Sequence, residues 1–309
     1  MTVTIYEGDN LDVLRPYPDG AFTLVYLDPP FNTGRTRERM IETTRPLAPE
    51  PDEPVAEETD DEKADPIIRT GFHGRQYERI RGSLRAFDDR FDDYWEFLEP
   101  RLWEAWRLLS DDGTLYLHLD YREAHYAKVM LDAIFGRDHF LNEIIWAYDY
   151  GGKTRKRWPT KHETILVYVK NPERYVFNSD DVDREPYMAP GLVTAEKAQR
   201  GKLPTDVWWH TIVPTSGKEK TGYPTQKPEG ILRRIVQASS RPGDMVLDMF
   251  AGSGTTGAVA DQLGRDAVLV DDNRTAAIVM RNRLPRARFV APDDADHTEY
   301  EEHLIASGD

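Results

Sequence analysis

The sequence predicts an α/β protein built on a doubly wound, mostly parallel sheet, and three observations point to it. Apolar runs of strand length alternate along the chain with segments whose apolar residues have helical spacing. Several of these runs are apolar throughout, as expected for strands buried on both faces. The 309 residues are 39% hydrophobic and 11% aromatic, which suffices for a large core. Helices should therefore cover both faces of the sheet.

The first half of the chain contributes strands separated by two helices. Residues 3–9 are expected to form a strand, and residues 22–31 a buried apolar strand. The second strand ends in a turn because the rings of two prolines fix the backbone. Residues 92–113 have helical spacing and stop at a glycine, with a kink expected at Pro100. After this helix we expect a strand at 113–120, a helix at 122–136, and strands at 141–148 and 163–170.

The last third of the chain repeats the strand-helix alternation. Residues 227–240 form a helix with Pro228 in its first turn, a position where proline's missing N–H costs nothing. The remaining expected elements are a strand at 244–250, a helix at 255–264, a strand at 267–272 and a helix at 273–284.

Composition divides the chain into parts. The expected catalytic domain combines residues 1–170 and 222–292. Residues 35–85 are expected to be an insertion, and 171–221, rich in Pro, Asp and Gly, an added recognition module. Residues 293–309 form an acidic tail.

The net charge of −15 is concentrated in two segments. Residues 48–65 carry −8 and residues 293–309 carry −7, so the rest of the chain is neutral overall. Both segments have too few apolar residues to offset the entropy of ordering, and we expect them to be flexible. A neutral body can carry a basic groove, so the global charge does not exclude a nucleic-acid partner.

Residue types that are rare or absent exclude several classes. The chain has no cysteine, which excludes disulfides, cysteine-ligated zinc and thiol catalysis, and fits a cytoplasmic location. No apolar run approaches the roughly 18 residues of a membrane span, and the N-terminus lacks a signal-peptide pattern. The eight histidines show no metal-ligand spacing, so we expect no metal and interpret His118 and His162 as structural.

A glycine-containing loop follows the predicted strand that ends at Asp248. Gly252 and Gly254 allow a ligand to approach the backbone closely, and the following helix offers free N–H groups. Asp271 ends the next strand 23 residues after Asp248, a spacing typical of an acid that binds ribose hydroxyls. The pattern lacks the third glycine of a dinucleotide site, which disfavours NAD.

A second loop, Asp28-Pro29-Pro30-Phe31, also follows a buried strand. The prolines hold their carbonyl groups rigidly, and a carboxylate beside a rigid carbonyl suits the two hydrogens of an amino group. Phe31 could stack on a planar base.

Together these motifs resemble the β-class S-adenosylmethionine-dependent DNA amino-methyltransferases. DPPF is similar to the catalytic motif of that family, and DMFAGSGTT is similar to its cofactor loop. YPTQKP at residues 223–228 and Asp9 in GDN resemble two further cofactor segments. The catalytic motif precedes the cofactor loop by 220 residues, the circularly permuted order that defines this class.

The resemblance implies a Rossmann-like methyltransferase fold that methylates a base flipped out of duplex DNA. Asp28 and the Pro29 carbonyl would bind the amino hydrogens and Phe31 would stack on the base, with Pro30 completing the motif. The cofactor S-adenosyl-L-methionine would contact the residues that match the family's cofactor segments: Asp9, Thr225, Gln226, Lys227, Asp248, Phe250, Ala251, Gly252, Ser253, Gly254, Thr255, Thr256 and Asp271.

Residues 151–161 contain five cations, no acid and one tryptophan, and are the predicted DNA-binding loop. Its cations are Lys153, Arg155, Lys156, Arg157 and Lys161. The expected partner is double-stranded DNA, and the family also suggests a homodimer and a cognate restriction endonuclease.

Three alternatives stay open at this point. The motif favours adenine N6 as the acceptor, but cytosine N4 presents nearly the same geometry. A catalytically silent DNA-binding module would keep the fold and lose the motifs, which are intact here. A dinucleotide-dependent dehydrogenase is the remaining option.

Overall fold

The computed structural model describes residues 2–30, 36–46, 67–70, 76–88, 94–214 and 216–290. The chain forms two compact units, one of Met1–Arg35 with Asp89–Asp309 and one of Thr36–Asp88. Phe31, the acidic stretch at 48–65 and the acidic tail at 293–309 lie outside the described residues.

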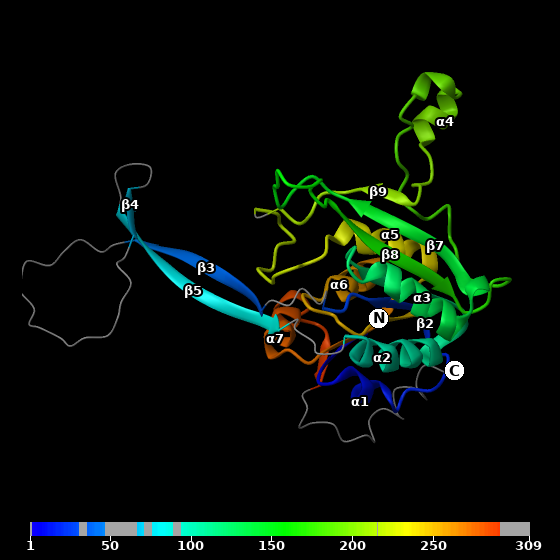
Figure 1. Ribbon diagram of the computed structural model, residues 1–309, viewed down its shortest axis with the longest axis horizontal. Helices are drawn as coiled ribbons and strands as arrows, with labels where there is room; N and C mark the ends of the chain where they lie inside the picture. The colour runs from blue at the N-terminus through cyan, green and yellow to red at the C-terminus, as the bar shows by residue number, and fades with distance from the viewer. Residues whose placement is uncertain are drawn as a thin grey trace, which may run out of the picture. The chain divides into compact units, whose positions relative to one another are not determined.

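The larger unit is built on one sheet with the order β12-β1-β11-β10-β2-β6-β8-β7-β9. Figure 1 labels β2, β8, β7 and β9 of this sheet. Neighbours from β12 to β6 are parallel, whereas β8 is antiparallel to both β6 and β7. The prediction of a mostly parallel sheet is confirmed. In sheet order the strands are Arg288–Val290, Val3–Glu7, Asp266–Asp271, Met245–Asp248, Phe22–Leu27, Leu109–Leu119, His162–Val169, Phe140–Ala147 and Val207–Trp209.

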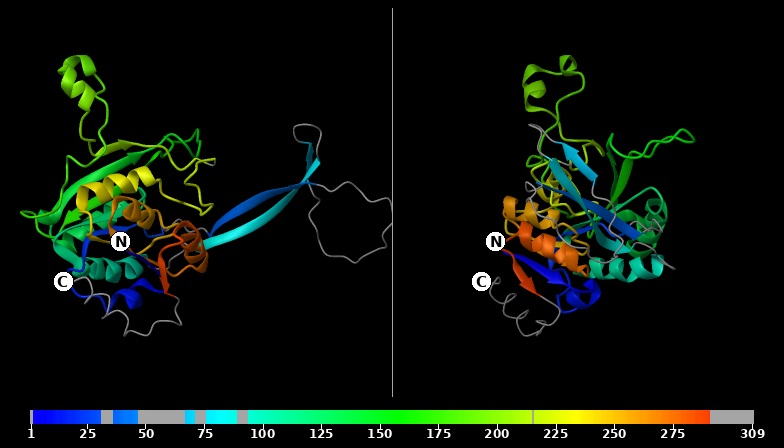
Figure 2. Two further views of the ribbon diagram at one scale, coloured as in Figure 1. Left: turned by 180° about the vertical axis from the view of Figure 1, so that it is seen from behind. Right: turned by 90° about the vertical axis from the view of Figure 1, so that its left-hand side faces the viewer.

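Helices cover both faces of this sheet, as Figures 1 and 2 show. Val25 and Leu27 of β2 share a core cluster with α1, α2 and α3, so these three helices cover one face. The hydroxyl of Tyr116 in β6 lies 2.8 Å from Ser239 Oγ in α5, which places α5 on the other face with α6 and α7. The bounds are Asn10–Leu14 (α1), Tyr94–Leu108 (α2), Ala124–Phe135 (α3), Glu229–Ser239 (α5), Thr255–Leu263 (α6) and Arg274–Arg283 (α7).

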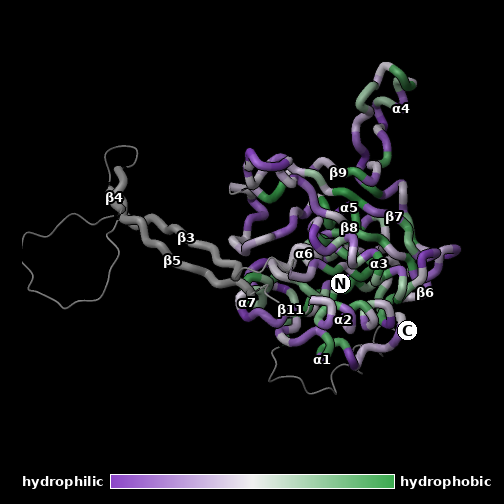
Figure 3. Tube along the Cα trace, viewed as in Figure 1, coloured by the Kyte–Doolittle hydropathy of each residue, from purple (hydrophilic) through white to green (hydrophobic). Residues whose placement is uncertain are grey.

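The hydropathy of the chain follows this architecture (Figure 3). The central strands β2, β10 and β11 are hydrophobic in their middle residues, and those side chains are almost fully buried. At about 25 cal/mol per Å² of apolar surface, burial of this sheet between two helical layers dominates the stability.

Some elements did not follow from sequence periodicity. The short elements α1 and β12 are only five and three residues long, too short for a periodic signal. Residues 171–221 contain the 3-10 helix Pro190–Leu192, helix α4 (Ala195–Arg200) and strand β9. Because β9 pairs with β7, part of the predicted recognition module belongs to the main sheet.

The smaller unit is a three-stranded antiparallel sheet of order β3-β5-β4. Its strands are Thr36–Pro46 (β3), Gln76–Asp88 (β5) and Ile67–Thr70 (β4). The sequence predicts an insertion here but not its strands, because charged residues interrupt any apolar alternation.

Candidate active site

Four aspartates meet at one edge of the sheet. Strands β1, β11, β10 and β2 are parallel neighbours, so their carboxyl ends lie at the same edge. Asp9, Asp271, Asp248 and Asp28 stand at or just after these ends. Adjacency of β10 and β2 thus joins two motifs that are 220 residues apart in the sequence. Ligands of open α/β sheets bind at this kind of edge.

The glycine loop after β10 is held from within by Asp248. The Phe250 N–H donates to one carboxylate oxygen at 3.1 Å and the Thr256 hydroxyl to the other at 2.5 Å. Burial raises the pKa of Asp248 to about 7 against these bonds. Asp248 is 3% exposed, so it stabilises the conformation of the loop from the protein interior.

The two glycines of the loop have left-handed backbone conformations, with φ of 51° at Gly252 and 71° at Gly254. A Cβ at Gly254 would lie 2.9 Å from Met280 Cγ, and one at Gly252 would lie 3.2 Å from the Tyr223 ring. Both positions therefore require glycine for backbone and packing reasons.

Asp271 joins the glycine loop to β11. Its carboxylate accepts the Gly252 N–H at 2.8 Å and the Asn273 N–H at 2.9 Å. Burial raises its pKa to about 6 in spite of both bonds. A carboxylate has about four lone-pair positions, so two stay available for hydroxyl donors.

Asp9 makes a contact that sequence reasoning missed. One oxygen caps α1 through the Leu11 N–H at 2.8 Å, and the other lies 2.7 Å from the Arg101 guanidinium. Arg101 projects from α2, which the sequence connects to no cofactor motif. Asp272 is electrostatically coupled to both groups, and burial raises its pKa.

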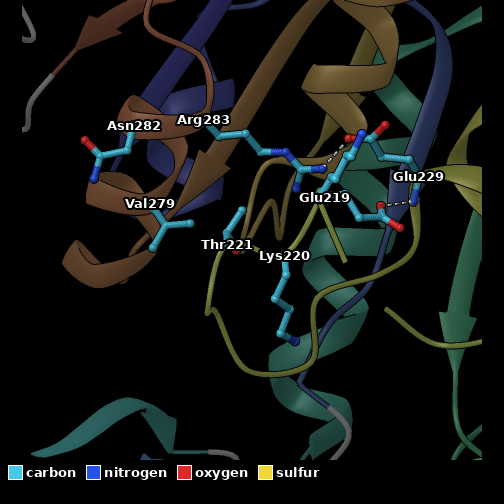
Figure 4. A pocket seen from close by; sticks show the side chains of 8 residues that line it. Glu219, Lys220, Thr221, Glu229, Val279, Asn282 and Arg283 are labelled. Carbon is cyan, nitrogen blue, oxygen red and sulfur yellow. Dashed lines mark hydrogen bonds and ion pairs between the residues drawn. The ribbon is translucent and has the colours of Figure 1, made fainter. Parts of the chain in front are cut away.

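The back of the glycine loop rests on α7. Arg283 donates to the Thr255 hydroxyl at 2.9 Å and to Glu229 at 2.7 Å, and its side chain is 9% exposed. A pocket of about 330 Å³ opens beside this contact (Figure 4). It is lined by Lys218, Glu219, Lys220, Thr221, Glu229, Val279, Asn282 and Arg283. None of the residues of the glycine loop or of the Asp-Pro-Pro turn lines this pocket. Arg283 contacts the glycine loop through the Thr255 hydroxyl and so supports it.

The three residues of the segment Thr225–Lys227 have different surroundings. Thr225 is exposed, with a positive φ of 60°. Gln226 is buried and holds its own turn, accepting from the Thr221 N–H at 2.9 Å and donating to the Glu219 carbonyl at 2.7 Å. Lys227 extends to Asp28 instead.

Asp28 forms a buried ion pair with Lys227. The Lys227 Nζ lies 2.8 Å from Asp28 Oδ2 and 3.4 Å from Glu163 Oε2. The side chain of Lys227 is 8% exposed, and those of both acids are 16% exposed. Burial lowers the pKa of Lys227, but the two carboxylates outweigh this effect and the net shift is upward. Asp28 Oδ1 is buried and has no hydrogen-bond partner among the described residues.

The chain of contacts continues behind Glu163. His118 Nε2 lies 2.8 Å from Glu163 Oε2, and His118 Nδ1 lies 2.8 Å from the Tyr26 hydroxyl. The Tyr148 hydroxyl donates to Glu163 Oε1 at 3.3 Å. Burial alone would raise the pKa of Glu163, but Lys227 and His118 lower it to about 2. The sequence carried no signal for Glu163, since only the antiparallel pairing of β8 brings its first residues to this edge.

Most cations of the predicted DNA-binding loop extend into solvent. Lys153, Arg155 and Lys156 are exposed, as is Arg157, whose guanidinium lies 3.4 Å from the Tyr121 hydroxyl. Lys161 differs, because its Nζ donates to the Asp149 carbonyl within the loop at 3.2 Å. Trp158 is 93% exposed, which is unusual for so large an apolar side chain.

Fold and site together define an α/β protein with a glycine-containing loop and an Asp-Pro-Pro turn at one edge of a mostly parallel sheet. Comparison with known proteins makes the class specific: a sequence model described as DNA methylase matches residues 22–279. The chain belongs to this DNA methylase family. The predicted class, an S-adenosylmethionine-dependent DNA methyltransferase, is confirmed. In the described ranges, no helix is both long and apolar enough to cross a membrane.

Relatives in sequence are DNA methyltransferases. The type II methyltransferase M.HpaI of Haemophilus parainfluenzae is 35% identical over 195 residues, which cover 63% of this chain and 60% of that protein. The DNA adenine methyltransferase YhdJ of Escherichia coli K12 is 29% identical over 278 residues, 87% of this chain and 78% of that protein.

Solved structures share the fold at low identity. M1.HpyAVI in complex with its cofactor SAM has a TM-score of 0.56 at 19% identity, over 91% of this chain and 98% of that chain. The cytosine-N4-specific PvuII methyltransferase has the same TM-score at 14% identity, over 94% and 95%. The predicted fold class is confirmed.

Proposed function

We propose that this protein transfers a methyl group from S-adenosylmethionine to the N6 amino group of an adenine in double-stranded DNA. The observation that carries the proposal is the half-buried Asp28 carboxylate at the edge shared with the glycine loop. Its Oδ1 atom is buried and has no hydrogen-bond partner among the described residues. YhdJ, which is named as a DNA adenine methyltransferase, supports adenine as the base.

The residues at the glycine loop fit the proposed cofactor. The Asp271 carboxylate has lone pairs left for ribose hydroxyls. Asn10 Oδ1 and Arg101 Nε are buried near Asp9 and have no partner among the described residues. An acceptor and a donor in this state suit the polar edge of an adenine. When bound, S-adenosylmethionine supplies an electrophilic methyl carbon on a sulfonium.

The protein's part in the reaction is to hold the amino group. Hydrogen bonds from the amino hydrogens to Asp28 and to the Pro29 carbonyl would keep the nitrogen lone pair out of ring conjugation and aim it at the methyl carbon. S-adenosylmethionine would supply the methyl group and leave as S-adenosylhomocysteine, and the proton lost by the methylated nitrogen would pass to solvent. Pro29 is buried and Pro30 half-buried, consistent with a rigid turn; the stacking role of Phe31 stays a prediction.

Mass spectrometry of nucleosides tests the proposed function. Unmethylated DNA incubated with the protein and S-adenosylmethionine should acquire N6-methyladenine. N4-methylcytosine alone would contradict adenine as the acceptor and retain the site. The absence of both marks, with a folded protein that binds the cofactor and DNA, would favour a silent DNA-binding module.

The exposed loop at residues 151–161 is the proposed DNA contact. It connects β7 to β8, and β8 begins with His162 directly before Glu163, so the loop borders the site. Because phosphate contacts release counterions, cations of this loop should set the salt dependence of DNA binding.

Replacing Lys153, Arg155, Lys156 and Arg157 by alanine should weaken DNA binding and reduce the slope of log K against log salt by about 2 to 4. Fluorescence anisotropy at several salt concentrations measures both. A charge-matched control replaces four exposed arginines that each lie within 4 Å of a carboxylate: Arg15, Arg137, Arg274 and Arg286. Equal slopes for both variants would place the DNA path elsewhere.

The resemblance suggests a homodimer, a cognate restriction endonuclease and a cytoplasmic location, which we retain as proposals. Analytical ultracentrifugation of the purified protein tests the first of them.

A further inference from the structure

A row of polar side chains, mostly buried, leads to Asp28, and the proposed cofactor and DNA contacts do not explain it. It connects Tyr26, His118, Glu163, Lys227 and Asp28. These five residues come from four segments of the protein, namely β2 with the turn after it, β6, β8 and the segment before α5. Each neighbouring pair is within 3.4 Å. Burying a polar group costs free energy unless it forms a hydrogen bond or an ion pair. These side chains are therefore stable only in an arrangement that gives them such partners.

The contacts in this row of side chains can be followed from Tyr26 to Asp28. Burial raises the pKa of Tyr26 far above its ordinary value, so its hydroxyl keeps its proton and can donate to His118 Nδ1. His118 Nε2 lies 2.8 Å from Glu163 Oε2. Glu163 in turn lies 3.4 Å from the Lys227 Nζ, which lies 2.8 Å from Asp28 Oδ2.

Lys227 makes the two oxygens of Asp28 different. Its Nζ occupies Oδ2 at 2.8 Å, whereas Oδ1 is buried and has no partner among the described residues. The carboxylate therefore has one oxygen held by a fixed cation and one oxygen that can accept from a substrate. A bond to Oδ2 also fixes the rotation of the carboxylate plane, which determines where Oδ1 points.

We propose that Lys227, held by Glu163, is a positioning residue that fixes the Asp28 carboxylate and directs its Oδ1 to the amino group of the target base. This inference rests on the proposed function. It also gives Lys227 a different role from the cofactor contact that the sequence predicts. Glu163 and His118 act one and two steps further back, since they hold Lys227 in place.

Lys227→Met tests the proposal because methionine keeps the apolar length and removes the charge. We expect the single-turnover rate of methyl transfer to fall about 100-fold, as when one preorganised electrostatic partner is lost. The dissociation constants of S-adenosylmethionine and DNA should stay within about threefold, which is under 1 kcal/mol. Glu163→Gln keeps the shape of the side chain and should lower the rate about tenfold. Lys227→Arg should restore part of the rate.

A matched control removes another ion-paired lysine. Lys128 lies 2.7 Å from Asp132 and 4.1 Å from the centre of the Phe140 ring, on the opposite face of the sheet. Lys128→Met should leave the transfer rate unchanged.

Three outcomes would overturn the inference. Weaker cofactor binding with an unchanged rate at saturation would make Lys227 a cofactor ligand. An unchanged rate of methyl transfer in both Lys227→Met and Glu163→Gln would give this row of polar side chains a purely structural role. Equal slowing by Lys128→Met would indicate a general loss of stability. If Lys227→Met does not fold, Glu163→Gln decides on the same criteria. Failure of the proposed function differs from all of these, since the wild-type protein would then transfer no methyl group.

Discussion

Asp28→Ala should lower the rate of methyl transfer by at least about 1,000-fold, since the amino group would lose the carboxylate that orients it. The binding of S-adenosylmethionine should stay within about threefold, because the contacts of the glycine loop run through Asp248 and Asp271. Transfer of a labelled methyl group under single-turnover conditions and calorimetry of cofactor binding measure the two quantities.

Asp132→Ala is a matched control for this substitution. Asp132 is also ion-paired with a lysine, Lys128 at 2.7 Å, and accepts from the Tyr168 hydroxyl, but it lies on α3. The control should change stability and leave transfer intact. Equal losses of transfer and of cofactor binding in Asp28→Ala would refute an orienting role for Asp28.

Gly254→Val should nearly abolish cofactor binding and destabilise the protein by about 3 kcal/mol. The left-handed backbone costs an L residue about 1–2 kcal/mol, and the contact with Met280 adds an overpacking cost of about 1–3 kcal/mol. The strain falls on the loop itself, which would move from its position beside Asp271. Denaturant unfolding and cofactor calorimetry check both parts.

Gly243→Val separates strain from function. Gly243 has a φ of 86°, and a Cβ there would meet nothing within 4 Å. It lies in the turn before β10, at the opposite end of that strand from the glycine loop. We expect the backbone cost without the loss of cofactor binding. A comparable loss in the control would mean that destabilisation alone explains the Gly254 result.

Local motifs were sufficient to predict the two loops of the site. A strand followed by Asp-Pro-Pro and a strand followed by a loop with two glycines each specify their own backbone, because proline and glycine restrict or extend φ without help from the rest of the chain. Long apolar runs likewise predicted the central strands and the mostly parallel sheet. Gly254 has the left-handed φ that a tight turn requires, and Asp271 accepts the Gly252 N–H; its contact with ribose stays a prediction.

Only the tertiary structure decided which charges meet. The motif assigned Lys227 to the cofactor, and the structure adds that its Nζ lies 2.8 Å from Asp28. His118, interpreted as structural, lies 2.8 Å from Glu163. Arg101 reaches Asp9 from a helix with no motif. These contacts depend on the order of the strands and on the antiparallel direction of β8. A sequence pattern predicts neither of these features. Local backbone preference acts over a few residues, whereas a buried ion pair depends on which strands become neighbours.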